Sequence, residues 1–198
     1  MPEYAVDDVE DRFNSRVIKS VVTPRPIAWV STTGEDGVDN LAPYSTYNYI
    51  SSANPVVMFN SPNPDHGGYK DSARNAIERE EFAVNLASED LIEPMDMSSA
   101  DIDPDESEFE FTELEAARCT TIDAPYVAAA AAVLECTLYD YHEIHDRVMV
   151  LGEVQHMHLD DRILDADGEV DMAKVKSVGR LGGPYYTVSE IHDYERQY

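Results

Sequence analysis

The sequence predicts a mostly β fold with short helices. Short apolar, β-branched runs alternate with Gly, Pro, Asn and Asp, a pattern typical of strands separated by turns. The chain has 198 residues, a length that one core can fill, and 43% of them are hydrophobic. We therefore expect a single domain over residues 1–198, with an acidic surface excursion around residues 95–123.

Several runs are predicted to be strands. The first is 27–32, which contains Trp29 as an expected core residue, and residues 38–47 return as its hairpin partner after a Gly-bearing turn. Further strands are expected at 56–60, 82–87, 133–143 and 148–159. The last two are nearly adjacent, joined through His145 and Asp146, and are expected to form a second hairpin.

Two segments are predicted to be helical. The first is 71–80, with Asp71 placed to cap it. Its apolar residues recur at helical spacing on one face, at Ala73, Ala76 and Ile77. The second is 88–97, with Ser88 as its cap. Its buried side is expected to consist of Leu91, Ile92 and Met95.

The charge of the chain is strongly negative. Against 14 Lys+Arg stand 40 Asp+Glu, which gives a formal net charge of −26. This balance argues against nucleic acid or an anionic membrane as partner, because both require basic surface. The excess of acidic residues and the small number of lysines, only four, also indicate a halophilic protein. In concentrated salt the repulsion between its negative charges is screened. The most acidic stretch, 101–113, is expected to be a solvated loop.

The sequence also bears on the compartment. Cys119 and Cys136 match no disulfide framework and no Cys-x-x-Cys spacing, which favours a reducing compartment. Residues 1–13 carry acids where a signal peptide would carry basic residues and then an apolar run. No apolar stretch approaches the roughly 20 residues of a membrane span. We therefore expect a cytoplasmic protein with no membrane partner.

Several common catalytic motifs are absent. No G-x-G-x-x-G follows a strand, and no P-loop, G-x-S-x-G elbow or H-E-x-x-H is present. Hydrolase and nucleotide-hydrolysing functions therefore have little support, and no residue is assigned as a catalytic acid, base or nucleophile.

Histidines in the second hairpin raise the alternative of a metal-binding barrel. His156 and His158 share one face of a strand, and His142 and His145 lie across the hairpin. Four neighbouring imidazoles would suit zinc or iron. The strand ends beside two aspartates, however, where a solvated surface is expected. No metal ligand is therefore assigned.

The turn at 67–69 leads into the first predicted helix. A helix N-terminus offers N–H groups and partial positive charge, which favour a phosphate. Lys70 lies at this start and Arg74 one turn later, so both would add positive charge within an acidic protein. A lysine that simply faces solvent is the alternative.

Residues 40–52 form an unusually polar and aromatic segment. It contains tyrosines, hydroxyl side chains and asparagines in one extended run. Such side chains suit a flat heterocycle with many polar edge atoms. A strand with tyrosines at a subunit interface is the alternative.

The order of these segments resembles the flavin reductase-like FMN-binding family. The resemblance covers residues 15–188 and is carried by RPIAWVST (25–32), NLAPYSTYNYIS (40–51), KDSARN (70–75), EEFAVNL (80–86), VLGEV (150–154) and GRLGGPYY (179–186). It implies a split β-barrel with Greek-key connections that forms a homodimer with FMN at the subunit interface. The implied cofactor-binding residues are Ser45, Thr46, Tyr47, Asn48, Ser51, Asn60, Lys70, Asp71, Arg180 and Tyr185.

The same resemblance implies an oxidoreductase. The expected activity is that of an NAD(P)H:flavin reductase, with NADH or NADPH as reductant and a small-molecule electron acceptor or a partner monooxygenase downstream. The alternative is a non-catalytic FMN-binding electron carrier, similar to flavoredoxin, that docks onto a partner enzyme. One departure concerns a histidine that the family often carries before the G-E-V block. Arg147 occupies that position here, and His145 is displaced by two residues.

Overall fold

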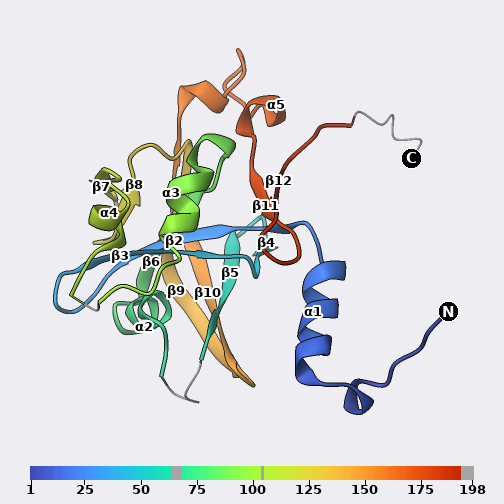
Figure 1. The fold of residues 1–198 in the computed structure, drawn as a ribbon. Coiled ribbons are helices and arrows are strands. Elements are labelled where there is room, and N and C mark those ends of the chain that lie inside the picture. Colours follow the sequence, from blue (N-terminus) through green and yellow to red (C-terminus); the bar gives the residue numbers. More distant parts are fainter. Residues whose placement is uncertain (64–67, 104, 193–198) are drawn as a thin grey trace.

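A seven-stranded antiparallel sheet forms the centre of the protein in a computed structural model that describes residues 1–63, 68–103 and 105–192 (Figure 1). In chain order its strands are β2 (Ala28–Thr33), β3 (Asp39–Tyr44), β4 (Tyr47–Ser51), β5 (Val56–Pro62), β6 (Glu81–Leu86), β9 (Ala132–Ile144) and β10 (Arg147–Leu159). Across the sheet they follow the order β3-β2-β6-β9-β10-β5-β4.

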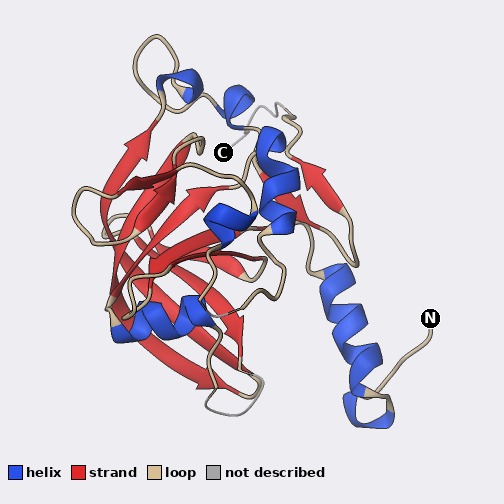
Figure 2. Ribbon diagram, turned by 60° about the vertical axis from the view of Figure 1, so that its left-hand side comes forward, coloured by secondary structure: helices blue, strands red, loops and turns tan. Residues whose placement is uncertain are grey.

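Smaller elements surround this sheet (Figure 2). A three-stranded sheet has the order β1-β11-β12 and consists of β1 (Arg25–Pro26), β11 (Val178–Arg180) and β12 (Tyr186–Val188). A two-stranded sheet pairs β7 (Ala116–Arg118) with β8 (Pro125–Val127). The α-helices are α1 (Asp11–Val21), α2 (Asp71–Glu78), α3 (Ile92–Met97), α4 (Glu108–Phe111) and α5 (Met172–Val175). Single 3₁₀ turns occur at Val6–Asp8, Glu89–Leu91 and Asp161–Ile163. Within the described ranges, no helix is long and apolar enough to cross a membrane.

The sheet is curled so that its two edge strands meet. Only Ser45 and Thr46 separate β3 from β4, although these strands stand at opposite ends of the strand order. The edges of a flat seven-stranded sheet would lie about 29 Å apart, whereas the chain from Tyr44 to Tyr47 can span at most about 11 Å. The sheet must therefore close into a barrel, and the Ser45-Thr46 link lies at its seam.

Two apolar clusters pack on the two faces of this sheet. The cluster inside the barrel includes Phe59 and Phe82, whose ring centroids are 5.3 Å apart. The other lies under α3 and includes Trp29, whose side chain is fully buried and whose Nε1–H donates to the hydroxyl of Ser98 at 2.9 Å. The prediction that Trp29 belongs to the core is confirmed.

The first predicted hairpin is only half right. Residues 28–33 pair with 39–44 as expected, but the strand does not continue to residue 47. The chain bends at Ser45 and Thr46, and β4 then pairs with β5 at the other edge of the sheet. The polar segment expected to be one strand is therefore two strands joined at the seam. The second hairpin, β9 with β10, is confirmed, and it turns at His145 and Asp146.

The predicted helices also need correction. Lys70 occupies the N-cap position of α2, and Asp71 is the first helical residue, whose carboxylate accepts a hydrogen bond from Arg74 instead of capping the helix. The predicted helix 88–97 divides into the 3₁₀ turn Glu89–Leu91 and α3, and the Ser88 hydroxyl donates to the Asp90 carboxylate at 2.5 Å. Helix α1 has no counterpart among the predicted elements.

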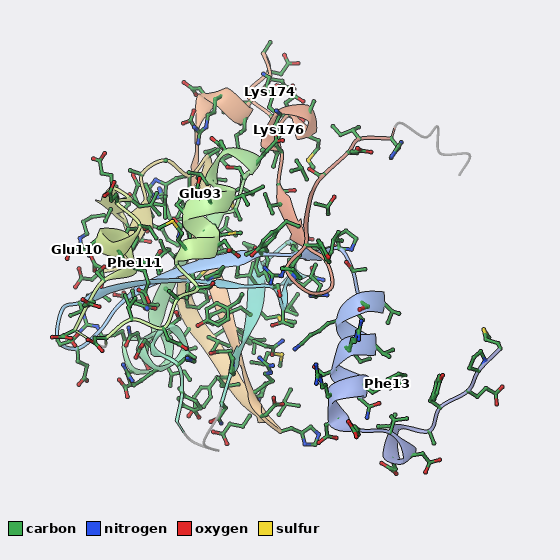
Figure 3. All side chains as sticks on the ribbon, in the orientation of Figure 1. Phe13, Glu93, Glu110, Phe111, Lys174 and Lys176 are labelled. Atoms are coloured by element: carbon green, nitrogen blue, oxygen red, sulfur yellow. The ribbon has the colours of Figure 1, made fainter. Side chains whose placement is uncertain are left out.

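The acidic excursion is not wholly solvated. Glu108 and Phe109, on α4, are buried with 7% and 4% exposure, because α4 packs against β3. Glu110 and Phe111 face outward (Figure 3). The stretch predicted to be a solvated loop therefore contributes the Phe109 ring and the Glu108 carboxylate to the interior.

Candidate functional site

A cleft runs along the seam of the barrel. It consists of two adjoining hollows of about 280 and 720 Å³, and the larger is within the roughly 300–1,000 Å³ usual for ligand pockets. Residues that line both hollows are Pro43, Ser45, Thr46, Ser99 and Arg147. We call this surface the seam cleft. Its centre is the link where β3 passes into β4.

Positive charge is concentrated in the seam cleft. Five of the 14 Lys+Arg line it but only four of the 40 Asp+Glu, so the local balance is reversed relative to the net charge of −26. The basic residues are Lys19, Arg25, Lys70, Arg147 and Arg180, and the acidic ones are Asp71, Asp96, Asp101 and Glu108. A pocket of this charge in a strongly acidic protein favours an anionic ligand.

The smaller hollow contains the start of α2. The Lys70 ammonium donates to Asp101 at 2.7 Å, and this hydrogen bond raises the pKa of the lysine. Asp101 is 90% exposed, so the pair faces solvent. The first turn of α2 also lies here, with Asp71 and buried Ser72 in the lining. The hollow thus combines a helix N-terminus with a lysine, the pairing that binds phosphate groups in proteins.

A buried hydrogen-bond network supports this hollow. Both Glu108 carboxylate oxygens accept from the Asn40 side-chain amide at 3.0 Å, and one also accepts from the Leu41 N–H at 2.9 Å. The amide oxygen of Asn40 accepts from the Ser72 hydroxyl at 2.6 Å. Burial raises the pKa of Glu108, although these hydrogen bonds lower it. The network therefore ties α4 and β3 to the first turn of α2.

Glu108 was missed by sequence reasoning. It stands among six acids in residues 101–110, and nothing in that local pattern separates it from its solvated neighbours. Glu108 directly precedes Phe109, which packs in the core, and this position beside an apolar residue is the local signal that could have pointed to it.

Arginines shape the larger hollow. The Arg25 guanidinium donates to the carbonyls of Lys19, Val22 and Leu181, at 2.6, 2.7 and 3.0 Å, and so joins the end of α1 to the loop after β11. The Arg180 guanidinium lies 4.4 Å from the centre of the Tyr186 ring. Burial and a hydrogen bond to Asp96 raise the pKa of Tyr186 to about 12.

The structure brings together six of the ten cofactor-binding residues expected from sequence. These line the seam cleft and are Ser45, Thr46, Asn60, Lys70, Asp71 and Arg180. Thr46 and Asn60 also contact each other, since the Asn60 N–H donates to the Thr46 carbonyl at 2.9 Å and the Thr46 hydroxyl donates to the Asn60 carbonyl at 3.1 Å. These bonds continue the β4–β5 pairing up to the link at the seam.

The other four expected residues lie outside the cleft lining. Tyr47 packs against the interior cluster, where burial raises its pKa to about 12. Asn48 is exposed and Ser51 half-buried on the edge strand β4. Tyr185 is 67% exposed, whereas its neighbour Tyr186 lines the cleft. Side chains alternate along a strand, so Tyr47 and Asn48 point to opposite faces of β4, and Tyr47 is the one that faces the interior.

Arg147 lines both hollows, while His145 does not line either. His145 occupies the hairpin turn with φ of 53° and is exposed. Within the described residues, the side chain that faces the cleft from the start of β10 is therefore an arginine.

Comparisons with known proteins agree with this geometry. The family model for the flavin reductase like domain matches residues 20–173. An uncharacterised protein of Aquifex aeolicus is 34% identical over 184 residues, which cover 93% of this chain and 94% of that protein.

Two solved structures share the fold. Nitrilotriacetate monooxygenase component B from Bacillus cereus superimposes with a TM-score of 0.92 at 26% identity, over 98% of both chains. A Shewanella frigidimarina protein described as a flavin reductase with a split barrel domain superimposes with a TM-score of 0.85 at 20% identity, over 100% of both chains. The expected split barrel is confirmed, and the chain belongs to the flavin reductase-like family.

Proposed function

We propose that the chain binds FMN in the seam cleft and acts as an NAD(P)H-dependent flavin oxidoreductase. The observation that carries this proposal is the concentration of five of the 14 basic residues in one cleft of a chain of net charge −26. FMN has an anionic phosphate and a flat ring system with polar edges, and it is the ligand expected for a member of this family.

The residues of the cleft fit such a ligand. Lys70 and the first turn of α2 would hold the phosphate, because the lysine supplies a full charge and the helix start a partial one. Ser45, Thr46 and Asn60 would contact the polar edge of the ring system, since they offer hydroxyl, amide and backbone groups at the seam.

When bound, FMN supplies the hydride and electron chemistry. The chain's own residues bind and orient. Arg147 lies where the two hollows join, so its guanidinium would place positive charge beside the ligand. Arg25 and Arg180 add charge in the larger hollow, which would suit the phosphates of NADH or NADPH. No side chain is assigned as a proton donor or acceptor.

A second copy of the chain is proposed to cover α1. This helix has no buried residue, and it projects from the barrel in both ribbon views (Figures 1 and 2). Its exposed apolar side chains are Phe13, Val17, Ile18 and Val21. Such a helix is rarely stable by itself and marks an interaction surface. Because Ile18 also lines the seam cleft, a homodimer formed there would place the flavin near the interface.

The electron acceptor is proposed to be a small molecule or a partner monooxygenase. The Bacillus cereus protein of the same fold is named as a monooxygenase component. This relationship supports an acceptor enzyme for the present chain.

The visible absorption spectrum of the purified protein during FMN titration tests the proposal. We expect saturable binding of about one FMN per chain, followed by bleaching when NADH or NADPH is added without oxygen. A protein that binds FMN, is reduced by dithionite and ignores both nicotinamides would instead be an electron carrier. A protein that does not bind FMN contradicts the proposal.

A further inference from the structure

Three potential metal ligands gather at the end of the β9–β10 hairpin farthest from its turn. Side-chain ligand atoms of Glu135, His156 and His158 all lie within 4.8 Å of one another. Glu135 is on β9 and both histidines are on β10. The seam cleft includes Arg147, the first residue of β10, so the cluster lies at the other end of this strand. His142, the other described histidine of these strands, pairs with Met149 and is not part of it.

A β-bulge creates the cluster. Val154 pairs with Cys136, but the next pair is His156 with Glu135, so Gln155 is the extra residue on β10. In regular pairing Glu135 would face Gln155, and the histidines would point to the other side of the sheet. The bulge therefore brings both imidazoles to the face that carries Glu135, which is how bulges re-aim side chains at sites.

The carboxylate of Glu135 is already oriented. It is fully buried and accepts from the N–H groups of Thr120 and Thr121 at 2.6 Å each and from the Thr121 hydroxyl at 2.5 Å. It also forms a short contact with Nε2 of His158. Outer hydrogen bonds of this kind hold metal-binding carboxylates in place.

The histidines pack against neighbouring rings, yet they remain accessible. Tyr126 stacks on the His158 ring at 4.9 Å, and the His156 and His158 rings are 5.0 Å apart. The His158 side chain is 27% exposed, so an ion can reach the cluster from solvent. In the described part of the chain, neither Lys nor Arg forms an ion pair with Glu135. A buried carboxylate without a permanent cation is a favourable ligand for one.

The geometry points to a Zn²⁺ site formed by Glu135, His156 and His158. Two imidazoles and one carboxylate are a donor set that Zn²⁺ accepts, with water in the remaining position. The ion would take the place of the direct contact between His158 and Glu135. It would also fix the Thr120-Thr121 segment to both strands of the hairpin. The site depends in no way on flavin binding.

Calorimetric titration with ZnCl₂ tests this inference. Tag-free protein is stripped with EDTA and titrated in KCl with excess MgCl₂, which occupies surface carboxylates. We expect about one Zn²⁺ per chain and a rise in the melting temperature, because the ion binds the folded state. His156→Ala should weaken binding by at least about tenfold. His142→Ala, which removes an exposed histidine of the same hairpin, should leave it unchanged.

Co²⁺ provides a second measurement on the unmodified chain. One equivalent should give visible ligand-field bands, and these should disappear when ZnCl₂ displaces the Co²⁺. This measurement does not depend on whether any variant folds. The inference is overturned if no such bands form, if Zn²⁺ binds without a stoichiometric endpoint, or if folded His156→Ala binds as tightly as His142→Ala.

Discussion

Lys70 is held at the start of α2 by a partner that an incoming anion can replace. Its ammonium pairs with Asp101, whose carboxylate is 90% exposed. Exposed ion pairs contribute little free energy, because water screens them. A phosphate that reaches Lys70 and the helix N-terminus therefore displaces the weak ion pair with Asp101 and forms a charge-assisted hydrogen bond with the ammonium.

Replacement of this lysine should weaken FMN binding. A hydrogen bond to a charged group contributes roughly 1.5–3 kcal/mol, so Lys70→Ala should raise the FMN dissociation constant about tenfold to a hundredfold. Lys176→Ala is the matched control, because Lys176 also pairs with an exposed carboxylate, Glu89 at 3.2 Å, beside α5 and outside the cleft (Figure 3). Flavin fluorescence titration measures both. If the two variants bind FMN with equal affinity, Lys70 does not contribute to the binding site.

Glu108 should give the fold a measurable pH dependence. Burial raises its pKa above the ordinary value of 4.5. A carboxyl of this kind stabilises the folded state below its ordinary pKa, and the contribution is lost as the pH rises through the raised value. Glu108→Gln carries no such charge. The free energy of unfolding of the unmodified chain, minus that of Glu108→Gln, should therefore fall as the pH rises above the ordinary value of 4.5.

Urea unfolding at several pH values measures this difference. Glu110→Gln serves as the control, since Glu110 is exposed on the same helix. The free energy of unfolding of the unmodified chain, minus that of Glu110→Gln, should not change with pH. A difference for Glu108→Gln that is constant or grows with pH would contradict the expectation.

At the scale of elements, β10 determines both the barrel interior and the histidine cluster. It pairs with β9 on one side and β5 on the other, and its register against β9 shifts twice, at Leu151/Gly152 and at Val154/His156. The second shift re-aims the histidines. The first lies at Gly152, where the Phe82 ring fills the space that a side chain would need.

Gly152→Ala should destabilise the fold. A Cβ at this position would lie 2.3 Å from Phe82 Cζ and 2.8 Å from Cys136 Cβ, inside a packed core. Overpacking of this kind costs about 1–3 kcal/mol. Gly34→Ala is a suitable control, since its nearest atom is the terminal Oδ1 of the Asp36 side chain, which can rotate away. Thermal unfolding compares the two, and equal melting temperatures would contradict the packing argument.

Helix α1 should decide the oligomeric state. Val21 is 68% exposed on a helix with no buried residue. If a second copy covers this surface, Val21→Asp should convert the dimer to a monomer of 22.2 kDa, because a buried unpaired charge is costly. Light scattering during gel filtration measures the mass. Val170→Asp, at an apolar residue that is 44% exposed elsewhere, should stay dimeric. An unmodified chain that is monomeric would exclude the dimer.

At the scale of the whole molecule, the net charge of −26 makes stability depend on salt. Like charges repel in the compact state, and the screening length falls from about 10 Å at 0.1 M to about 3 Å at 1 M. We expect the melting temperature to rise steeply with KCl below about 1 M and to level off above it. Differential scanning calorimetry measures this. A melting temperature independent of KCl would exclude the halophilic interpretation.

Much of the fold could be predicted from local pattern. Alternation and turn residues located the strands of both hairpins, and helical spacing located α2. These signals are short-range: they depend on side-chain period and backbone preference within about ten residues. The family resemblance added the barrel, which periodicity did not provide. Helix α1 was not predicted, because no capping side chain marks its start and its Val and Ile residues favour strands.

By itself the sequence determined three things: its composition the acidic charge, its alternation of apolar runs with turn residues the mostly β fold, and its motifs the family. Only the tertiary structure decided which residues meet. Lys70, Arg147 and Arg180 converge because the sheet curls until its edges touch at Ser45 and Thr46. Glu108 is buried because α4 folds onto β3, and a single extra residue aims two histidines at Glu135. These contacts join residues far apart in sequence, and they depend on sheet curvature and strand register, which no local pattern encodes.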